Sequence, residues 1–256
     1  MSVLIAEGVG VRHRRRWIVR GLDAVVEPGE LVALTGPPGS GRTTALLALA
    51  GRFKLSAGKI HTPAGTPPSA RDSDTPAPDA PPAADADPVD GTPIDVVPDE
   101  AAPGDAGRDE AGTVGPMRRG VALAYVAGVN DPEPTATVAE HVRERLALLG
   151  HRRRRFGRRR ELPSVPLLGL DPDLRGRDLT PYQRQLLGLV LARMENPAVI
   201  ALDDWDAGLD EAERWRLRQI FTDLTTEGIA VIITARTVAC DLTTHVINLE
   251  KLEVAA

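Results

Sequence analysis

Hydrophobic positions along the chain follow two periods, and these predict strands alternating with helices. Alternate apolar residues at 22–26 indicate a strand with one buried face, and Pro28-Gly29 then supplies a turn. Four short runs are almost wholly apolar, which indicates strands buried on both faces: 31–35, 120–126, 198–202 and 229–233. Such strands are typical of a parallel sheet that helices cover on both sides.

Helical spacing of apolar residues predicts a helix at 44–50 and a second that opens at the Thr137–Glu140 capping box. In the second helix, we expect Val138, Val142 and Leu149 to share the inner face.

Two further helices lie nearer the end of the chain. One begins at Thr180-Pro181, with the hydroxyl as cap and the proline in the first turn, and it stops before Pro197. Its apolar stripe consists of Leu186, Leu187, Val190, Leu191 and Met194. The other is marked by apolar Leu217, Ile220, Phe221 and Leu224, and it ends at Gly228.

The composition is that of an ordinary globular protein, with 42% apolar and 26% charged residues among 256. One cysteine, Cys240, allows no internal disulfide, which favours a reducing compartment. No apolar run approaches the ~20 residues that span a bilayer, and residues 1–13 lack the pattern of a signal peptide. These features predict a cytoplasmic protein.

The net charge of −5 conceals an acidic insert at 61–116. This segment holds 12 of the 22 prolines and 12 of the 36 acidic residues, and its net charge is −10. Repeated Pro, Ala, Asp and Gly offer little to bury, so we expect the insert to be disordered. The remaining 1–60 and 117–256, with a net charge of +5, would form the folded part.

A glycine-rich stretch, Gly36–Thr44, joins the 31–35 strand to the helix that follows. Glycines at 36, 39 and 41 let backbone N–H groups converge on an anion, and the helix adds its positive N-terminal end. The pattern is G-x-x-x-x-G-K-[ST] with arginine for lysine at Arg42. A plain turn between two elements is the alternative, and the order strand, loop, helix favours phosphate binding.

Further downstream, Leu202–Asp210 resembles the Walker B and D-loop stretch of the ATP-binding cassette (ABC) family, and Leu179–Gln185 resembles a worn copy of its LSGGQ signature. Glu27–Glu30, Ser56–Gly58 and Thr234–Arg236 match further family features in the family's order. The resemblance covers the whole chain apart from the insert.

This resemblance implies an α/β fold of the P-loop NTPase class. The expected ABC-type nucleotide-binding domain has a mostly parallel sheet, an antiparallel β subdomain and a helical subdomain. The implied cofactors are ATP and Mg²⁺. The implied partners are an integral membrane permease subunit and a second cassette, in a homodimer or heterodimer at the inner face of the cell membrane.

The family's functional positions fall on specific residues here. Thr43 and Asp203 match the Mg²⁺ positions. The nucleotide-binding positions are Gly36, Gly39, Ser40, Gly41, Arg42, Thr43, Thr44, Asp203 and, in the signature, Thr180.

Several catalytic positions depart from the family pattern. Arg42 cannot simply occupy the place of a lysine ammonium. Asp204 stands at the catalytic glutamate position with one methylene less, which makes it a weak base. Ala235 falls at the switch histidine and Gly128 at the glutamine that senses the γ-phosphate. These changes predict nucleotide binding with weak or absent hydrolysis.

The signature is altered as well. Pro181 lacks an N–H group, and Tyr182 places a ring where glycine permits close phosphate approach. His13 falls near the family's adenine-stacking aromatic and Trp17 is a second candidate; we assign neither. His141, among Glu140, Arg143 and Glu144, is expected at the surface.

Seven arginines crowd the run His151–Arg160. The positive charge of Arg152 to Arg160 could bind anionic lipid headgroups or an acidic loop of a permease. Nucleic acid is a competing ligand for such a run. The alternative is a solvated loop with no fixed partner.

Three functions are therefore distinguished. The first is a transporter's ATP-binding subunit. The second is a pseudo-ATPase scaffold or regulator that binds partners through the arginine run and the acidic insert and has an empty P-loop. The third, a nucleic-acid-associated cassette, is weaker because such proteins generally need paired cassettes.

Overall fold

The computed structural model describes residues 2–14, 16–62, 120–149, 165–237, 243 and 245–249. These residues all belong to one unit of the chain. Most of the predicted acidic insert, the arginine run 152–160 and Cys240 lie outside the described residues, so the expectations for them stay predictions. In the described part, no helix combines the length and the apolar character that crossing a membrane requires.

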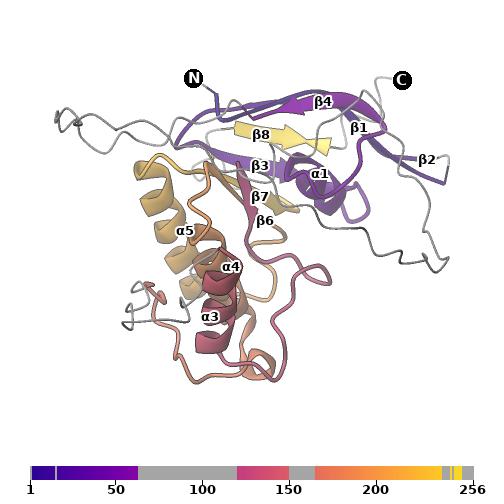
Figure 1. Cartoon of the computed structure of the whole chain (residues 1–256). Helices are drawn as coiled ribbons and strands as arrows, with labels where there is room; N and C mark the ends of the chain where they lie inside the picture. Colours follow the sequence, from indigo (N-terminus) through magenta and orange to yellow (C-terminus); the bar gives the residue numbers. More distant parts are fainter. Residues whose placement is uncertain are drawn as a thin grey trace, which may run out of the picture. The chain divides into compact units, whose positions relative to one another are not determined.

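Two sheets form the upper part of the molecule (Figure 1). The antiparallel sheet has the order β2-β1-β4 and consists of β1 (Leu4–His13), β2 (Arg16–Val26) and β4 (Ala57–His61). The parallel sheet has the order β5-β6-β7-β3-β8 and consists of β3 (Leu31–Thr35), β5 (Val121–Leu123), β6 (Val199–Leu202), β7 (Ala230–Ala235) and β8 (His245–Asn248). The predicted parallel sheet and antiparallel subdomain are both confirmed.

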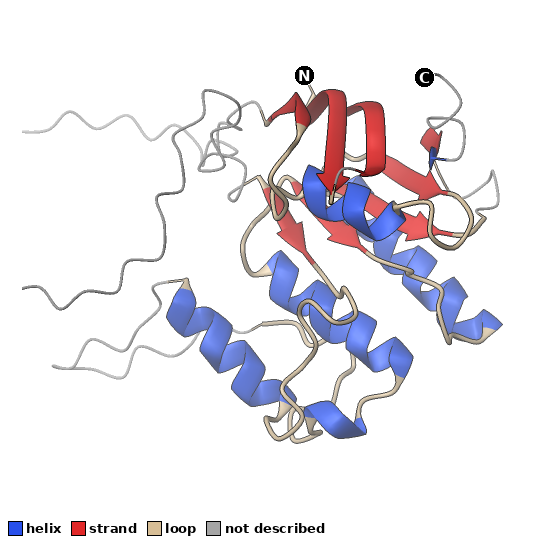
Figure 2. Cartoon of the chain, turned by 90° about the vertical axis from the view of Figure 1, so that its right-hand side faces the viewer, coloured by secondary structure: helices blue, strands red, loops and turns tan. Residues whose placement is uncertain are grey.

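Four α-helices and one short 3-10 helix complete the described part, and Figure 2 shows them against the strands. They are α1 (Arg42–Leu49), α3 (Val138–Leu148), η1 (Gly176–Asp178), α4 (Pro181–Arg193) and α5 (Glu211–Thr226). The capping boxes at Thr137 and Thr180 form, and a third at Asp210 opens α5. Most helices therefore begin where a side chain satisfies their free N–H groups.

The core divides along the two faces of the parallel sheet. On one face, Val32 and Leu34 pack with α1 and the antiparallel sheet. On the other, Leu31 and Ala33 pack with residues of α4 and α5. Because successive residues of a strand point to opposite faces, an almost wholly apolar strand serves both cores at once.

Two of the differences from the sequence-based expectation concern β5 and α3. The strand expected at 120–126 is shorter, ending at Leu123. In α3 the third inner position is Leu146, 4% exposed, whereas Leu149 is 39% exposed just beyond the helix. Leu146 packs with Val142 and Val190, which joins α3 to α4.

Gly188 lets α4 approach the segment that follows β5. A Cβ atom at Gly188 would lie 2.5 Å from the Tyr125 backbone nitrogen. Real Cβ atoms essentially never come so close, so only glycine fits here without movement. This close contact places α4 directly against the segment that follows β5.

Candidate nucleotide-binding site

The site lies where β3, β6 and β7 end, because parallel strands bring their carboxyl ends to one edge of the sheet. Their register pairs Thr35 with Ala235 and Leu202 with Ile233. Residues that follow these strands, the glycine loop, Asp203 and Asp204, are therefore neighbours despite a separation of 160 residues between Thr43 and Asp203.

The glycine loop after β3 has the backbone that its sequence predicts. Gly39 and Gly41 have φ values of 85° and 86°, in the left-handed region that favours glycine. A Cβ at Gly41 would lie 2.7 Å from the Ile18 carbonyl oxygen, so the loop also packs closely on β2. Gly41 caps α1 without a side-chain hydrogen bond, and no acidic residue stands in the first turn of α1. The N-terminal end of this helix thus keeps its attraction for an anion.

Ser40 supplies an unpaired polar atom inside the loop. Its Oγ is buried and has no hydrogen-bond partner among the residues that the structure describes. A buried hydroxyl without a partner costs free energy, and a phosphate oxygen in the loop would remove that cost.

Thr43 and Asp203 meet directly. The Thr43 hydroxyl donates a 2.7 Å hydrogen bond to Asp203 Oδ2, and the Thr234 hydroxyl donates one of 2.5 Å to Asp203 Oδ1. Both oxygens of this carboxylate, which is 8% exposed as a residue, are thereby fixed. A hydroxyl and a carboxylate are oxygen ligands of the kind that Mg²⁺ prefers.

Thr234 is a site residue that motif reasoning missed. Besides bonding to Asp203, its Oγ1 accepts a 2.7 Å hydrogen bond from the Asp204 backbone N–H. One fully buried hydroxyl therefore orients two successive aspartates. Gln185 was also missed; its Nε2 donates a 3.5 Å hydrogen bond to the Asp203 carbonyl oxygen. Both residues lie in stretches matched to family motifs, but the motifs alone gave no sign of these hydrogen bonds.

Arg42 does not point into an open loop. Its Nη1 donates a 3.0 Å hydrogen bond to the Gly36 carbonyl oxygen, and its Nη2 lies 3.0 Å from Asp204 Oδ1. The Arg42 side chain is only 11% exposed. The loop's own cation is thus bound to a carbonyl and to the carboxylate at the catalytic glutamate position.

Asp204 sits in a mixed electrostatic environment. Burial raises the pKa of this carboxyl above its ordinary value, the Arg42 guanidinium lowers it, and the Asp203 carboxylate raises it again. Asp206 and Arg236 act more weakly in opposite directions on the same pKa. Asp204 also has a φ of 37°, a left-handed conformation that aspartate tolerates better than most residues.

The Gly128 position offers no side chain to a phosphate. Its N–H donates a 2.7 Å hydrogen bond to Asp131 Oδ2, and the Tyr125 hydroxyl donates one of 2.9 Å to Asp131 Oδ1. Ala235 is fully buried and ends in a methyl group. Neither position can replace the amide or imidazole that the resemblance implies there.

Thr180 stays apart from the glycine loop in the described contacts. Its hydroxyl accepts from the Gln183 N–H at 3.2 Å, and Gln183 Oε1 accepts from the Thr180 N–H at 3.0 Å. Thr44, by contrast, lies in the first turn of α1 beside Thr43. The structure therefore brings the other predicted site residues together and leaves Thr180 as the cap of α4.

His13 and Trp17, the two candidates for stacking on adenine, differ in their surroundings. His13 ends β1 and is exposed. Trp17 lies against the backbone of Gly10, and the guanidinium carbons of Arg12 and Arg20 lie 5.5 and 5.8 Å from its ring centroid. Trp17 is already engaged in cation–π contacts, which leaves its ring a poor platform for a base.

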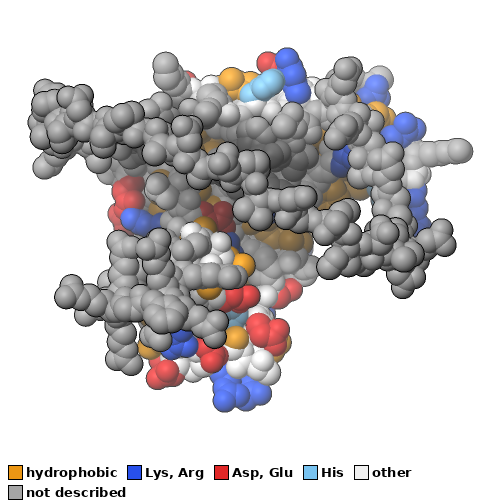
Figure 3. Space-filling model, viewed as in Figure 1, with side chains coloured by type: hydrophobic (Ala, Val, Ile, Leu, Met, Phe, Trp, Pro, Cys, Tyr) orange, Lys and Arg blue, Asp and Glu red, His pale blue; other side chains and the backbone are white. Residues whose placement is uncertain are grey.

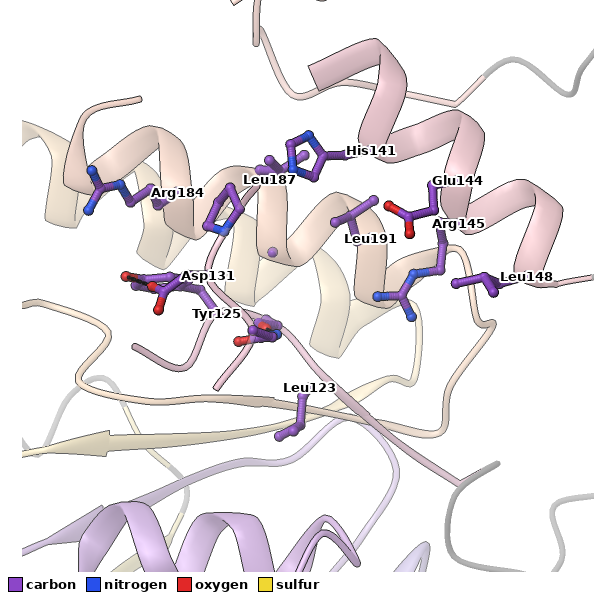
Figure 4. A pocket seen from close by; sticks show the side chains of 14 residues that line it. Leu123, Tyr125, Asp131, His141, Glu144, Arg145, Leu148, Arg184, Leu187 and Leu191 are labelled. Carbon is purple, nitrogen blue, oxygen red and sulfur yellow. Dashed lines mark hydrogen bonds between the residues drawn. The ribbon is translucent and has the colours of Figure 1, made fainter. Parts of the chain in front are cut away.

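His141 is buried, so the expectation of a surface residue is wrong. It is 8% exposed and lies beside a cavity of about 200 Å³ between α3, α4 and the segment after β5 (Figure 4). Its Nε2 accepts from the Glu133 N–H at 2.9 Å, and Nδ1 lies 2.8 Å from the Thr137 carbonyl oxygen. The loop around Glu133 covers the His141 ring, although the charged helical neighbours of His141 had suggested that it was exposed.

On the face seen in Figure 3, acidic and basic side chains are mixed around the end of the molecule that carries α3 and α4.

No group of three or more His, Cys, Asp or Glu in the described ranges could hold a metal ion. A magnesium site here would depend on Thr43, Asp203 and oxygen atoms of a bound nucleotide.

Parts of the sequence are similar to known ATP-binding proteins. The family model described as ABC transporter matches residues 19–79. A zinc import ATP-binding protein of Rhizobium johnstonii is 46% identical over 59 residues, which is 23% of this chain and 20% of that protein. A putative ABC transporter ATP-binding protein of Streptomyces coelicolor is 28% identical over 250 residues, 97% of this chain and 36% of that protein. The chain thus aligns with a fifth to about a third of the length of these relatives.

Solved structures show the same fold at low sequence identity. A dimeric ATP-binding cassette in a post-hydrolysis state with ADP and phosphate has a TM-score of 0.63 and 16% identity, over 96% of this chain and 93% of that chain. An ATP-binding cassette of an ABC transporter in its ADP conformation has a TM-score of 0.62 and 16% identity, over 97% and 87%. The fold predicted from sequence is confirmed by both.

Proposed function

We propose that the chain is an ATP-binding cassette of the ABC transporter family and serves as the ATP-binding subunit of a membrane transport system. In this proposal it binds ATP-Mg²⁺ and hydrolyses it weakly or not at all. Its similarity to ABC transporter ATP-binding proteins and its fold support the proposal. The observation that carries the proposal is the 2.7 Å contact between the Thr43 hydroxyl and Asp203 at the mouth of the glycine loop.

Several groups of this site already lie where they could bind a nucleotide and its metal ion. The loop N–H groups and the N-terminal end of α1 would hold the phosphates, with Ser40 Oγ as an added donor. Thr43 and Asp203 would hold Mg²⁺, which neutralises charge on the β- and γ-phosphate oxygens when it is bound. Thr234 keeps Asp203 in place for that task.

Weak hydrolysis follows from the surroundings of Asp204. A general base must reach the proton of the attacking water, and here the short carboxylate is paired with Arg42 at 3.0 Å. The ion pair holds the carboxylate on the Arg42 guanidinium, which limits how far it can reach toward a water molecule. Gly128 and Ala235 add no group that could orient the water or sense the terminal phosphate.

Nucleotide would act through population shift. ATP at an interface between two cassettes favours the closed pair by its differential affinity for that state, without hydrolysis. We propose a second cassette and an integral membrane permease as partners, with the protein at the inner face of the cell membrane. The names of the import relatives and the dimeric cassette structures support this assembly. Contact of Arg152 to Arg160 with anionic lipid is part of the proposal.

The test uses the purified full chain, with ATP-Mg²⁺ binding measured by calorimetry and phosphate release measured at steady state. We expect saturable binding with little phosphate release. A robust steady-state rate that disappears in Asp203→Ala would refute weak hydrolysis.

A pseudo-ATPase scaffold is the second candidate, and the position of Arg42 favours it. A guanidinium already bound to Gly36 and Asp204 leaves the loop with little net positive charge. The scaffold predicts no change of Tm with millimolar ATP-Mg²⁺, whereas a nucleotide-binding subunit predicts a rise through ligand linkage.

A further inference from the structure

A cavity of about 470 Å³ opens beside the start of the glycine loop. Gly36 and Pro37 line it from the loop, and Arg236 and Thr237 line it from the segment after β7. Strand register explains this neighbourhood: Thr35 pairs with Ala235 in parallel β3 and β7, so Gly36 and Arg236 leave the sheet side by side.

Arg42 and Arg236, the two arginines near this cavity, differ in their exposure and in their contacts. Arg42 is 11% exposed and bound to the Gly36 carbonyl and to Asp204. Arg236 is exposed, and within the ranges that the structure describes it makes no ion pair. Arg236 is therefore the cation at the loop entrance that is exposed and not held in a described ion pair.

We propose that Arg236 is the cation that contacts the terminal phosphate of ATP, in place of Arg42, which stays paired with Asp204. The proposal rests on the proposed function, because it concerns the same nucleotide site. Its substrate class is a nucleoside triphosphate, recognised by the charge of its last phosphate.

The chemistry of the side chain suits this role. A guanidinium presents a planar fork of N–H donors that matches phosphate oxygens and is weakly hydrated. Arg236 and Gly36 line the same cavity, so the guanidinium lies at the edge of the loop that would hold the phosphates. Asp204, near both arginines, would repel a phosphate if Arg42 left it. Keeping Arg42 on Asp204 and using Arg236 for the phosphate avoids this repulsion.

The test compares affinities for ATP-Mg²⁺ and ADP-Mg²⁺ by calorimetry at low salt, with the full chain and four variants. Arg236→Ala should weaken ATP binding by about tenfold or more, as expected for a lost hydrogen bond to a charged group, and leave ADP binding unchanged. Arg236→Lys should restore part of the ATP affinity. Arg42→Ala should change both affinities by a similar factor. Arg143→Ala removes an exposed arginine of α3 and should change neither.

Four results separate the possibilities. An Arg236→Ala variant with wild-type affinity for both nucleotides overturns the proposal. Equal losses for both nucleotides in Arg236→Ala also overturn it, because they indicate a structural role. Wild-type protein that binds ADP but shows no preference for ATP leaves nucleotide binding intact and overturns only the role of Arg236. Failure to bind either nucleotide contradicts the proposed function itself.

Discussion

Arg42 Nη2 lies 3.0 Å from Asp204 Oδ1, so the arginine in the phosphate loop is paired with the carboxylate at the position of the catalytic base. The other end of the same guanidinium donates to the Gly36 carbonyl oxygen at 3.0 Å. A planar fork can make both contacts at once, which a lysine ammonium cannot do in the same geometry. The departures at 42 and 204 are thus coupled in space.

The first prediction concerns this pair. In the double variant Arg42→Lys with Asp204→Glu, the longer carboxylate reaches further and the ammonium no longer bridges to Gly36. We expect steady-state ATP hydrolysis to rise about tenfold or more, within the range ascribed to general-base catalysis. Arg193→Lys serves as the control, since Arg193 pairs with Glu227 away from the site. Unchanged hydrolysis with intact ATP binding would show that the pair does not limit turnover.

Thr234→Val should weaken both the fold and the site. The change removes the only hydroxyl that bonds Asp203 Oδ1 among the described contacts, and leaves a buried carboxylate oxygen unpaired. We expect the free energy of unfolding to fall by about 1–3 kcal/mol, measured by urea denaturation, and ATP-Mg²⁺ affinity to fall with it. Thr234→Ser keeps the hydroxyl and should stay close to wild type. Equal effects of valine and serine would count against the bridging role.

Thr180→Ala tests whether this residue is the cap of α4. Loss of its hydrogen bond from the Gln183 N–H should lower the free energy of unfolding by about 1 kcal/mol. Thr180→Ser should retain most of the stability. Because Thr180 does not contact the glycine loop in the described structure, ADP affinity of the isolated chain should not change. A change in that affinity would place Thr180 in the site of its own chain.

Gly188→Ala sets two effects against each other. Alanine in a helix interior is favoured over glycine by about 1 kcal/mol. The new Cβ would lie 2.5 Å from the Tyr125 nitrogen, however, and overpacking of this kind costs about 1–3 kcal/mol. We expect the variant to be less stable than wild type in thermal unfolding. A higher Tm would mean that α4 can move away from Tyr125 at little cost.

The sequence was informative where local pattern decides structure. The strand before Gly36, the loop glycines and the caps at Thr137 and Thr180 all follow from short-range rules, and the structure has them as predicted. The partner of Arg42 could not be predicted, because it depends on how a strand end 162 residues away meets the loop.

His141 shows the same limit. Its charged helical neighbours indicate a solvated face, and only the covering loop around Glu133 buries the ring. Thr234 follows the predicted strand 229–233, and its hydrogen bonds to the two aspartates appear only when β6 and β7 are paired.

Magnesium dependence of ATP binding tests the central claim most directly. The measurement is a calorimetric titration of ATP into the full chain, with and without Mg²⁺, beside Asp203→Asn under the same conditions. The account predicts tight binding that weakens when Mg²⁺ is removed and a variant that no longer responds to the metal. ATP affinity that is the same with or without Mg²⁺, or the same in Asp203→Asn, would contradict it.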